Sequence, residues 1–333
     1  MAPSGRGTAI IGAGLMGRWH ADAVVRIGGA VTLIVDPNED ARNALGKKHP
    51  GARVEGRLDA AAVAKIASVA HVCTPLATHV RLMTDLIEAG VHVLAEKPFT
   101  GNASEARAIV DMAAKRGVLV CPVHQFLFQE GVRDLHSWLP ELGPVRRIEF
   151  STCSAGAVGG DAAAQDALIA EVLPHPLSLV NKLLQVQTSE LDWQVVHPMP
   201  GEFRAIASAK ETVVDVAISA HGRPTENVLR VIGDNGSAVA DLFHGFASRL
   251  SPTVSRGAKL TKPFTTSAGT FAAAATNLAR RAARGESAYP GLRELVRAFH
   301  NAVSVGGATP IGVDATLDVS IARDSLLSLI TRA

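Results

Sequence analysis

A glycine-rich turn near the start of the chain has the residue types and spacing of a phosphate-binding turn. It follows a β-branched run, residues 8–12, and precedes a helix predicted over residues 15–27. The first glycine allows a tight bend, the second lets the backbone approach a pyrophosphate, and the third lets helix and strand pack closely. Amides at the helix N-terminus then face the phosphates. A simple glycine turn is the alternative, but the strand–helix context favours dinucleotide binding. The predicted contact residues are Gly12, Gly14, Leu15, Met16 and Gly17.

An acidic residue at the end of the second predicted strand bears on which dinucleotide binds. Asp36 closes the run 31–36 and lies 19 residues after Gly17. A carboxylate there accepts hydrogen bonds from the adenosine ribose hydroxyls and repels a 2′-phosphate, so the sequence favours NAD over NADP. A second interpretation stays open, because Pro37 is a residue that commonly opens a helix and Asp36 would then be its N-cap.

The first third of the chain alternates short apolar runs with helical patterns. We predict strands over 8–12, 31–36, 69–74, 91–95 and 118–123, and helices over 15–27, 38–45, 77–88 and 103–116. Apolar strands with little polar alternation, separated by helices, indicate a parallel sheet covered on both faces. The predicted fold of residues 1–123 is therefore an α/β Rossmann domain with a doubly wound parallel sheet.

The rhythm changes after residue 123, and we predict a second domain over 124–333. Predicted helices cover 130–138, 167–184, 290–305 and 314–331, and predicted strands cover 145–153, 191–196, 203–209, 212–219, 227–232 and 237–241. Consecutive strands with hairpin-length links predict a large open antiparallel sheet in an α/β domain. Residues 155–164 and 252–267 are predicted loops. The C-terminal helix is a candidate to pack back on the Rossmann domain.

Two further motifs give the chain a family resemblance. Residues 74–79 (TPLATH) follow one strand, and residues 95–98 (AEKP) follow the next. With the glycine-rich turn, they resemble the glucose–fructose oxidoreductase/inositol dehydrogenase family, Gfo/Idh/MocA. The resemblance implies an NAD(P)-dependent dehydrogenase or reductase that acts on a CH–OH or C=O group of a sugar, cyclitol or related small molecule. The cofactor-contacting residues it implies beyond the turn are Thr74, Pro75, His79, Glu96 and Lys97.

The resemblance also implies catalytic residues. Lys97 matches the family's catalytic lysine and His175 its catalytic histidine. Hydride transfer from an alcohol needs a base for the hydroxyl proton, which a neutral histidine suits, and an ammonium group stabilises developing alkoxide charge. Glu171 lies four residues before His175, so on one helix the two share a face and the carboxylate orients the imidazole. A solvated lysine, a helix-entry histidine and an exposed helix carboxylate are the structural alternatives.

Local differences from the family bear on the pocket. Pro174 and Pro176 flank His175, and a helix that starts near Pro176 would leave Glu171 on a loop. His124 and Gln125 end the last strand of the first domain, and we predict that they line the substrate pocket, with His124 as a second candidate base. A capping pair at the domain junction is the alternative. The predicted substrate-contacting residues are Lys97, His124, Gln125, Glu171 and His175.

Composition excludes several classes of protein. The net charge is +2 and aromatic residues make up 4% of the chain, so nothing favours nucleic acid or an acidic membrane as a partner. Three cysteines, far apart in sequence, form neither a disulfide framework nor a metal site, and we predict no metal. No apolar run reaches transmembrane length and residues 1–7 lack a leader pattern, so we expect a cytoplasmic protein.

The leading prediction is an NAD-dependent oxidoreductase with a small-molecule substrate. A redox-neutral enzyme that keeps its NAD, for elimination, hydrolysis or rearrangement, is an alternative. A non-catalytic dinucleotide sensor is a weaker one, because Lys97 and His175 are both present. The open sheet of the second domain needs covering, so we expect a homodimer or homotetramer.

Overall fold

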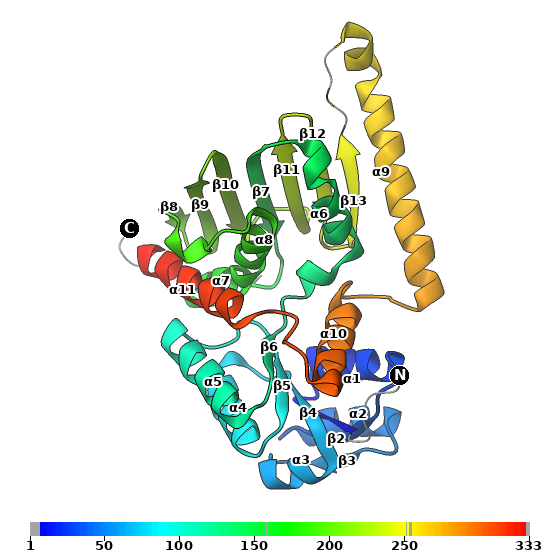
Figure 1. The fold of residues 1–333 in the computed structure, drawn as a ribbon, viewed down its shortest axis with the longest axis vertical. Coiled ribbons are helices and arrows are strands. Elements are labelled where there is room, and N and C mark those ends of the chain that lie inside the picture. The colour runs from blue at the N-terminus through cyan, green and yellow to red at the C-terminus, as the bar shows by residue number, and fades with distance from the viewer. Residues whose placement is uncertain (1–6, 158, 251, 253–254, 331–333) are drawn as a thin grey trace. The chain divides into compact units, whose positions relative to one another are not determined.

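The computed structural model describes residues 7–157, 159–250, 252 and 255–330, and the chain divides into two compact units. The first unit comprises Met1–His124 and Leu292–Ile321, and the second comprises Gln125–Gly291 and Ala322–Ala333. The expectation about residues 1–7 falls almost entirely outside the described residues. Each unit is built on one sheet (Figure 1).

The first unit contains a six-stranded parallel sheet of the order β3-β2-β1-β4-β5-β6. Its strands are β1 (Gly7–Ile11), β2 (Val31–Val35), β3 (Arg53–Glu55), β4 (Ala67–Val72), β5 (His92–Ala95) and β6 (Val120–Pro122). β1, β4 and β5 are buried almost throughout, as expected for a sheet covered on both faces. The predicted Rossmann sheet is confirmed, and the short edge strand β3, which lacks apolar residues other than Val54, was not predicted.

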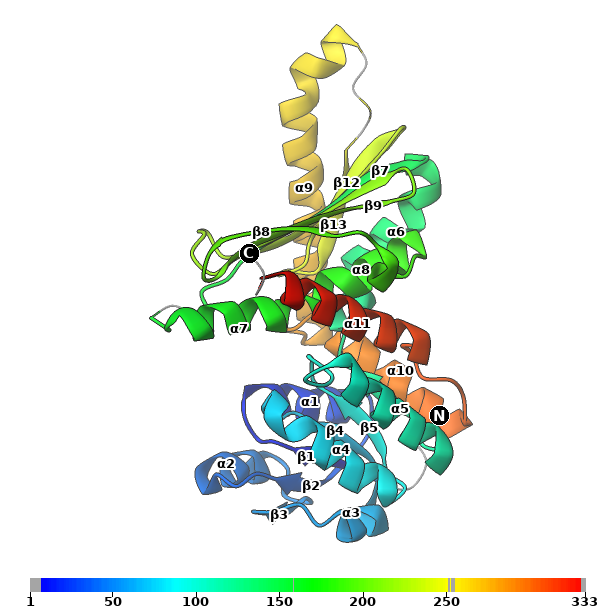
Figure 2. The same cartoon turned by 90° about the vertical axis from the view of Figure 1, so that its left-hand side faces the viewer.

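Helices cover both faces of this sheet. They are α1 (Leu15–Arg26), α2 (Glu39–Lys48), α3 (Ala60–Ile66), α4 (His79–Glu88), α5 (Ala103–Arg116) and α10 (Leu292–Val305), with the short 3-10 turn η1 (Leu76–Thr78) before α4. α1 packs beside α10, and α4 packs beside α5 on the other side of the sheet (Figures 1 and 2). Because the helices lie on the two faces of the sheet, the loops at the carboxyl ends of the strands, where such sheets bind ligands, are left uncovered by them.

The second unit contains a seven-stranded sheet of the order β13-β12-β11-β7-β10-β9-β8. Its strands are β7 (Val145–Cys153), β8 (Gln194–Met199), β9 (Glu202–Ala209), β10 (Thr212–Ser219), β11 (Glu226–Gly233), β12 (Gly236–Asp241) and β13 (Phe246–Leu250). The predicted antiparallel sheet is confirmed at every pair of neighbouring strands except β7 and β10, which pair in parallel, so the sheet is mixed. Between β7 and β10 the chain passes through α7, α8 and the β8–β9 hairpin, so these two paired strands are not consecutive in sequence.

Helices cover one face of the second sheet. α6 (Glu130–Leu142) packs on β12 and β13, and α7 (Ala162–Val172) packs on β9 and β10. α7 and α8 (Pro174–Leu184) lie on the same side of the sheet (Figure 2), and the 3-10 turns η2 (Gln125–Phe128) and η3 (Thr188–Glu190) flank this layer. Along β9, buried and exposed residues alternate, so the opposite face of the sheet is open.

The predicted helix 167–184 is wrong as a single element. α7 ends at Val172 and α8 begins at Pro174, with Leu173 between them. Pro174 occupies the first turn of α8, where its missing N–H costs nothing, but in the middle of a longer helix it would remove a hydrogen bond. Asp161 caps α7 by accepting from the Ala164 N–H, so the helix starts inside the predicted loop 155–164.

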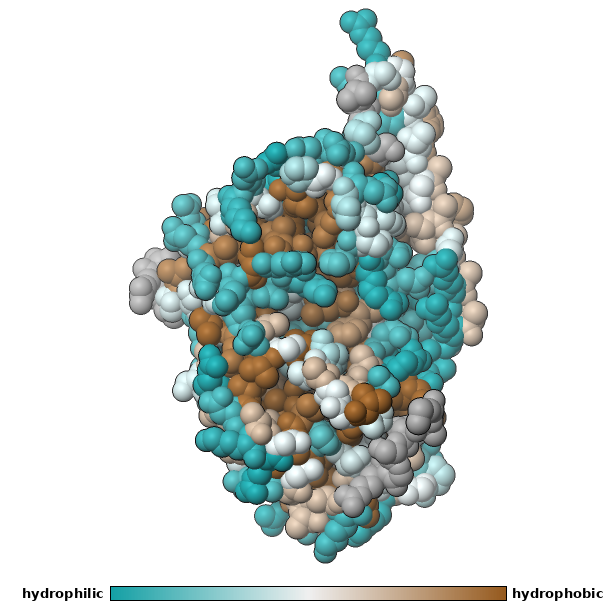
Figure 3. Space-filling model, in the orientation of Figure 1, coloured by the Kyte–Doolittle hydropathy of each residue, from teal (hydrophilic) through white to brown (hydrophobic). Residues whose placement is uncertain are grey.

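The predicted loop 252–267 is also wrong over most of its length. α9 (Arg256–Arg284) is a single helix of 29 residues, and the Ser255 hydroxyl caps it by accepting from the Ala258 N–H. Pro263 lies within it. The face of α9 seen in Figure 3 is mostly white and tan, which fits its many Ala, Gly, Ser and Thr residues.

α11 (Val313–Ile330) is the last described element. Its residues up to Ile321 group with the first unit, and those from Ala322 group with the second. Within the described residues, no helix combines the length and the hydropathy that crossing a bilayer requires.

Candidate active site

The glycine-rich turn connects β1 to α1 in the first unit. Gly12 has φ +100°, and a Cβ there would lie 2.5 Å from the Cys73 carbonyl oxygen, so the tight bend requires glycine. A Cβ on Gly17 would lie 1.8 Å from the Gly12 oxygen, which is the close helix–strand packing that the sequence predicted. A Cβ on Gly14 would meet nothing within 4 Å. The turn therefore has a packed side and an open side.

The open side lies at the N-terminus of α1. Gly14 is the N-cap residue, no side chain caps the helix among the described residues, and its first turn has no acidic residue. Unpaired amides and the positive end of the helix dipole make such a terminus a site for anions. Leu15 is 58% exposed beside it. These features fit the diphosphate of a dinucleotide.

Asp36 is tied to the same turn. Its Oδ2 accepts a hydrogen bond from the Ala13 N–H at 2.7 Å, and its Oδ1 accepts from the Asn38 N–H at 2.8 Å. The N-cap of α2 is Asn38, whose side chain accepts from the Ala41 N–H, so the interpretation of Asp36 as that N-cap is wrong. Asp36 is half-buried, and its carboxylate is held against the turn at the end of β2.

Glu96 and Lys97 follow β5 at the carboxyl edge of the same sheet. The Glu96 carboxylate is buried, with its Oε2 accepting from the Lys97 N–H at 3.1 Å and its Oε1 lying 3.0 Å from His20 Nε2. Lys97 is half-buried. The burial of Glu96 and its two contacts fix the backbone at Lys97, directly after the end of β5.

His124 ends the connection after β6 and is 2% exposed. Burial lowers the pKa of its imidazole to about 4, with the Lys97 charge lowering it further and the Glu96 charge opposing. Its Nδ1 has no hydrogen-bond partner among the described residues. A neutral, buried imidazole with an unpaired nitrogen is suited to meet a ligand's hydroxyl group.

Three residues of the predicted set belong to the connection between β4 and α4. Thr74 is half-buried and Pro75 is exposed, whereas His79 is 1% exposed. His79 Nε2 lies 2.8 Å from the Thr74 oxygen, and its Nδ1 lies 3.1 Å from the Pro98 oxygen. His79 therefore connects the loop after β4 to the loop after β5. These contacts hold the backbone that follows Lys97 in place.

His175 is in the second unit, in the first turn of α8, and is 7% exposed. Its ring stacks on Phe126 with centroids 4.1 Å apart and planes inclined by 21°. The buried Ser178 hydroxyl donates to the His175 carbonyl at 2.9 Å, so this serine satisfies the backbone of the helix and does not project toward a substrate. The stack fixes the plane of the imidazole.

Glu171 and His175 lie on different helices, so the argument that one continuous helix face carries both is wrong, and so is the alternative that Glu171 lies on a loop. Glu171 is exposed near the end of α7. It lies in the electrostatic field of Arg323, where its charge opposes the lowering of the arginine pKa by burial. Arg323 also donates to the Ala170 carbonyl at 2.9 Å. Gln125, in η2, is 7% exposed, and its Oε1 has no hydrogen-bond partner among the described residues.

Comparison with known proteins adds independent support for the sequence resemblance. Residues 6–124 match the sequence model of GFO_IDH_MocA, described as "Oxidoreductase family, NAD-binding Rossmann fold". The sequence of the Rossmann domain is thus similar to the Gfo/Idh/MocA family of oxidoreductases. It is 37% identical over 112 residues to inositol 2-dehydrogenase of Rhodococcus erythropolis, a match that covers 33% of this chain and 32% of that protein. The curated relatives are each matched over less than half of their length.

Solved structures with this fold cover nearly the whole chain. An oxidoreductase from Agrobacterium radiobacter, in complex with NAD+, L-tartaric acid and magnesium, covers 98% of this chain and 96% of its own, with a TM-score of 0.75 and 16% identity. A 3-ketoreductase from Actinomadura kijaniata in complex with NADP covers 97% of both chains, with a TM-score of 0.70 and 16% identity. These likenesses show that the fold of both units occurs in solved oxidoreductase structures.

Sequence reasoning missed a set of buried side chains in the first unit. His20 of α1, His71 of β4 and His300 of α10 form a chain of ring contacts that ends on Glu96. The available signal was a histidine in the middle of an otherwise apolar strand at position 71. Its partners lie 51 and 229 residues away in sequence, so the pattern alone did not reveal them.

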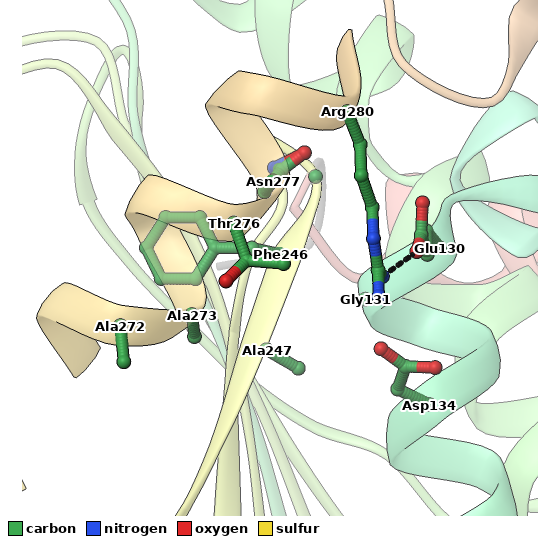
Figure 4. Close-up of a pocket in the computed structure, with 11 residues that line it drawn as sticks. Glu130, Gly131, Asp134, Phe246, Ala247, Ala272, Ala273, Thr276, Asn277 and Arg280 are labelled. Carbon is green, nitrogen blue, oxygen red and sulfur yellow. Dashed lines mark hydrogen bonds and ion pairs between the residues drawn. The ribbon is translucent and has the colours of Figure 1, made fainter. Parts of the chain in front are cut away.

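A separate cavity in the second unit lies between α9, β13 and α6, with a volume of about 280 Å³ (Figure 4). Arg280 reaches across it to pair with Glu130, and burial beside Glu130 raises the pKa of Asp134. None of the predicted site residues lines this cavity, so it is not the site that the glycine-rich turn and Lys97 indicate.

Proposed function

We propose that this protein is an NAD(P)-dependent dehydrogenase or reductase that transfers hydride between nicotinamide and a carbon–oxygen centre of a small polyhydroxylated substrate, such as a cyclitol, a sugar or a related secondary metabolite. One observation carries the proposal. The α1 N-terminus, open at Gly14, follows the carboxyl end of β1. The buried Glu96, which fixes Lys97, follows the carboxyl end of β5 in the same sheet. Open α/β sheets bind ligands at this edge.

The residues present fit a dinucleotide. The diphosphate would meet the amides around Gly14, Leu15 and Met16, while Gly12 and Gly17 provide the bend and the packing. Thr74, Pro75, His79, Glu96 and Lys97 complete the proposed cofactor-contacting set, with His79 connecting the two loops. When bound, the nicotinamide accepts a hydride from the substrate or gives one to it.

Each proposed catalytic residue has a distinct task. The Lys97 ammonium stabilises the negative charge that develops on the substrate oxygen, and it does so best from a rigid, half-buried position. His175, its ring plane fixed by Phe126, takes or gives the hydroxyl proton. Glu171, exposed near the end of α7, is the proposed orienting carboxylate, acting from a separate helix and not from a shared helix face. Lys97, His124, Gln125, Glu171 and His175 are the proposed substrate-contacting residues.

Asp36 supports NAD over NADP as the preferred cofactor. Its carboxylate is anchored on Ala13 and Asn38, so it cannot swing away from a 2′-phosphate without breaking both hydrogen bonds. Fluorescence titration of the purified protein with NADH and NADPH tests this preference. We expect tighter binding of NADH, and a reversed preference in Asp36→Ser. Tighter NADPH binding by the unaltered protein would contradict the assignment.

Turnover is tested by absorbance at the NADH band with a panel of inositols, aldoses, sugar acids and keto sugars. We expect net NADH formation or consumption with at least one of them, lost in His175→Asn while dinucleotide binding persists. Binding without any net change across the panel would contradict the proposal. Cytoplasmic location and assembly as a homodimer or homotetramer stay predictions from the sequence.

A further inference from the structure

α9 carries the four most exposed large apolar side chains of the described residues. Leu260 is 78% exposed, Phe264 77%, Phe271 75% and Leu278 70%. Single exposed apolar residues are common on protein surfaces, but a contiguous row commonly marks a surface that another molecule covers. At 3.6 residues per turn these four side chains fall within about 40° of one another and form one row about 27 Å long. This row is the α9 stripe.

The second unit holds α9 by a different face. The half-buried positions of the helix centre about 110° around it from the stripe, which is more than a quarter turn. Asn277 and Arg281 donate from this face to the His244 carbonyl at 2.9 and 2.8 Å, and Arg284 pairs with Glu130 at 3.2 Å. No residue of α9 is buried, so the described part of the chain leaves the stripe uncovered. The half-buried positions are Thr266, Thr270, Ala273, Ala274, Asn277 and Arg281.

The N-terminal half of α9 extends past the ends of the sheet strands of its unit (Figures 1 and 2). Residues 255–265 are all exposed. This half contains Gly257, Pro263 and Gly269, which are poor helix formers. Most helices in proteins are stabilised by packing of an amphipathic face rather than by propensity. A molecule that covers the stripe would therefore stabilise this half of the helix.

The charge of α9 indicates the chemistry of that molecule. Its 29 residues include four Arg, two Lys and no Asp or Glu. The basic residues near its C-terminus contact Glu130 or backbone carbonyls of the second unit. Arg256, Lys259 and Lys262, near its N-terminus, are exposed at the positive end of the helix dipole, where negative charge is favoured. The net charge of the whole chain, +2, gave no reason to expect an acidic membrane as a partner, but it conceals this strongly basic segment.

We propose that α9 binds the surface of a bilayer that contains anionic phospholipids, with its stripe at the acyl boundary and its N-terminal basic residues at the phosphate groups. Interfacial helices bury Phe and Leu in this way, and their long basic side chains reach back to the headgroups. Arg256, Lys259 and Lys262 lie between about 60° and 180° around the helix from the stripe. The other exposed positions of α9 carry only Ala, Gly, Ser, Thr and Pro, so no carboxylate of α9 repels the headgroups. The proposal is independent of the dehydrogenase function.

Charge also separates this partner from a second copy of the chain. Two α9 helices packed stripe to stripe would bring basic ends beside basic ends in both the parallel and the antiparallel direction, because both ends of α9 are basic. Like charges disfavour such pairing of helices. A bilayer with anionic lipids supplies an apolar layer and the opposite charge together.

The first test measures flotation of the full-length protein with extruded vesicles. It should bind vesicles of equal parts phosphatidylcholine and phosphatidylglycerol, and bind phosphatidylcholine alone at least about tenfold more weakly, because each basic side chain near an anionic surface contributes about fivefold. High salt should weaken the binding to anionic vesicles. Failure to bind the anionic vesicles, or equal binding to both compositions, would overturn the proposal.

Substitutions in the stripe are matched with one outside α9. Phe264→Ser and Phe271→Ser each remove an exposed ring, so each should weaken binding to the anionic vesicles about tenfold and leave the melting temperature unchanged. Phe243→Ser is the control, because this ring is 56% exposed in the turn between β12 and β13, and it should bind like the unaltered protein. Equal binding by all four proteins, or an equal loss in all three variants, would overturn the proposal.

Hydrogen exchange locates the contact on the protein. Amides of residues 256–268 should exchange more slowly on anionic vesicles than in solution, whereas those of β9 and β10, on the open sheet, should be unchanged. Protection of β9 and β10 instead of α9 would overturn the proposal.

Sedimentation equilibrium without lipid tests the second copy. A dimer that is lost in Phe271→Ser and kept in Phe243→Ser would assign the stripe to a second copy of the chain and overturn the lipid proposal. The mass of Phe271→Ser should instead equal that of the unaltered protein. Dinucleotide binding in solution should be the same in all these variants, because none of the substituted residues belongs to the proposed active site.

Discussion

The six-stranded sheet of the first unit and the seven-stranded sheet of the second handle polar side chains in opposite ways. In the first, helices cover both faces and the polar groups are buried among them, as with His20, His71 and Glu96. In the second, one face is open and carries exposed ion pairs between neighbouring strands, such as Arg204 with Asp215. Buried polar groups are costly unless each has a partner, whereas exposed pairs contribute little.

This difference shows where chemistry is built. A charge or an imidazole held inside low-dielectric surroundings has a fixed position and a shifted pKa, both of which catalysis requires. The ion pairs on the open sheet face solvent and suit solubility or contact with another protein surface. We therefore expect substitutions to have large effects in the first unit's polar set and small effects on the second unit's open face.

Lys97→Ala should have the largest effect. Loss of the ammonium group from its half-buried position should reduce kcat roughly 10³-fold, the range seen when one group that stabilises an oxyanion is removed. Dinucleotide binding, measured by fluorescence, should persist. Lys115→Ala, on the exposed face of α5, is the matched control and should be silent. If the kcat of Lys97→Ala stayed within about threefold of that of the unaltered enzyme, substitutions in the first unit's polar set would not have the larger effect that we expect.

Acid should destabilise the protein through the buried histidines of the first unit. The folded pKa of His300 is about 4, below the unfolded value near 6.5, so the unfolded chain takes up the proton first as the pH falls. The stabilisation from this residue is complete above pH 6.5, and about 3 kcal/mol is lost as the pH falls to 4.

Chemical denaturation between pH 7 and 4.5 measures this loss. The decline in unfolding free energy should be smaller in His300→Phe than in the unaltered protein. His221→Gln, in an exposed turn of the second unit, should leave the decline unchanged. Equal declines in all three proteins would contradict the buried-histidine account.

Two glycines of the same turn should behave differently. Gly17→Ala places a Cβ 1.8 Å from the Gly12 oxygen, so it should destabilise the first unit by about 2 kcal/mol or more. Gly14→Ala meets no atom within 4 Å and should leave the melting temperature unchanged while weakening dinucleotide binding. The two variants thus separate the effect of packing from that of binding. A loss of stability in Gly14→Ala would contradict the open side of the turn at Gly14.

Arg204→Ala should have the smallest effect. The guanidinium pairs with Asp215 across β9 and β10 on the open face and is exposed. We expect a change in unfolding free energy of less than about 1 kcal/mol, and unchanged kcat. Denaturant titration at low and high salt checks this expectation. A loss of unfolding free energy comparable with that of Gly17→Ala would contradict the expectation that ion pairs on the open face contribute little to stability.

The residues that could be identified from sequence are those fixed by local rules. Gly12, Gly14 and Gly17 follow a strand and open a helix, and Lys97 follows a strand at its carboxyl end, so short-range context was enough to predict where they lie in the fold. The strands of the first unit were predicted for the same reason, since buried parallel strands are continuous apolar runs. Asp36 was placed correctly at the strand end but not at a helix cap, because Asn38 takes that role.

The features that could not be identified depend on contacts between distant residues. The parallel pairing of β7 with β10 is decided by the path of the chain between them, which short turn signals do not report. The break at Leu173 follows from two prolines whose helix positions were ambiguous. α9 has no buried residue, and its apolar residues Leu260, Phe264, Phe271 and Leu278 are exposed at helical spacing in a segment whose Gly and Pro residues favoured a loop. The histidine chain joins residues from α1, β4 and α10.

A crystal structure of the protein grown with NAD+ tests the central claim most directly. The account predicts electron density for the diphosphate at the amides around Gly14, the adenosine ribose beside Asp36, and the nicotinamide ring next to the Lys97 ammonium. Density elsewhere, or an empty turn under conditions where NAD+ binding is saturated in solution, would contradict it.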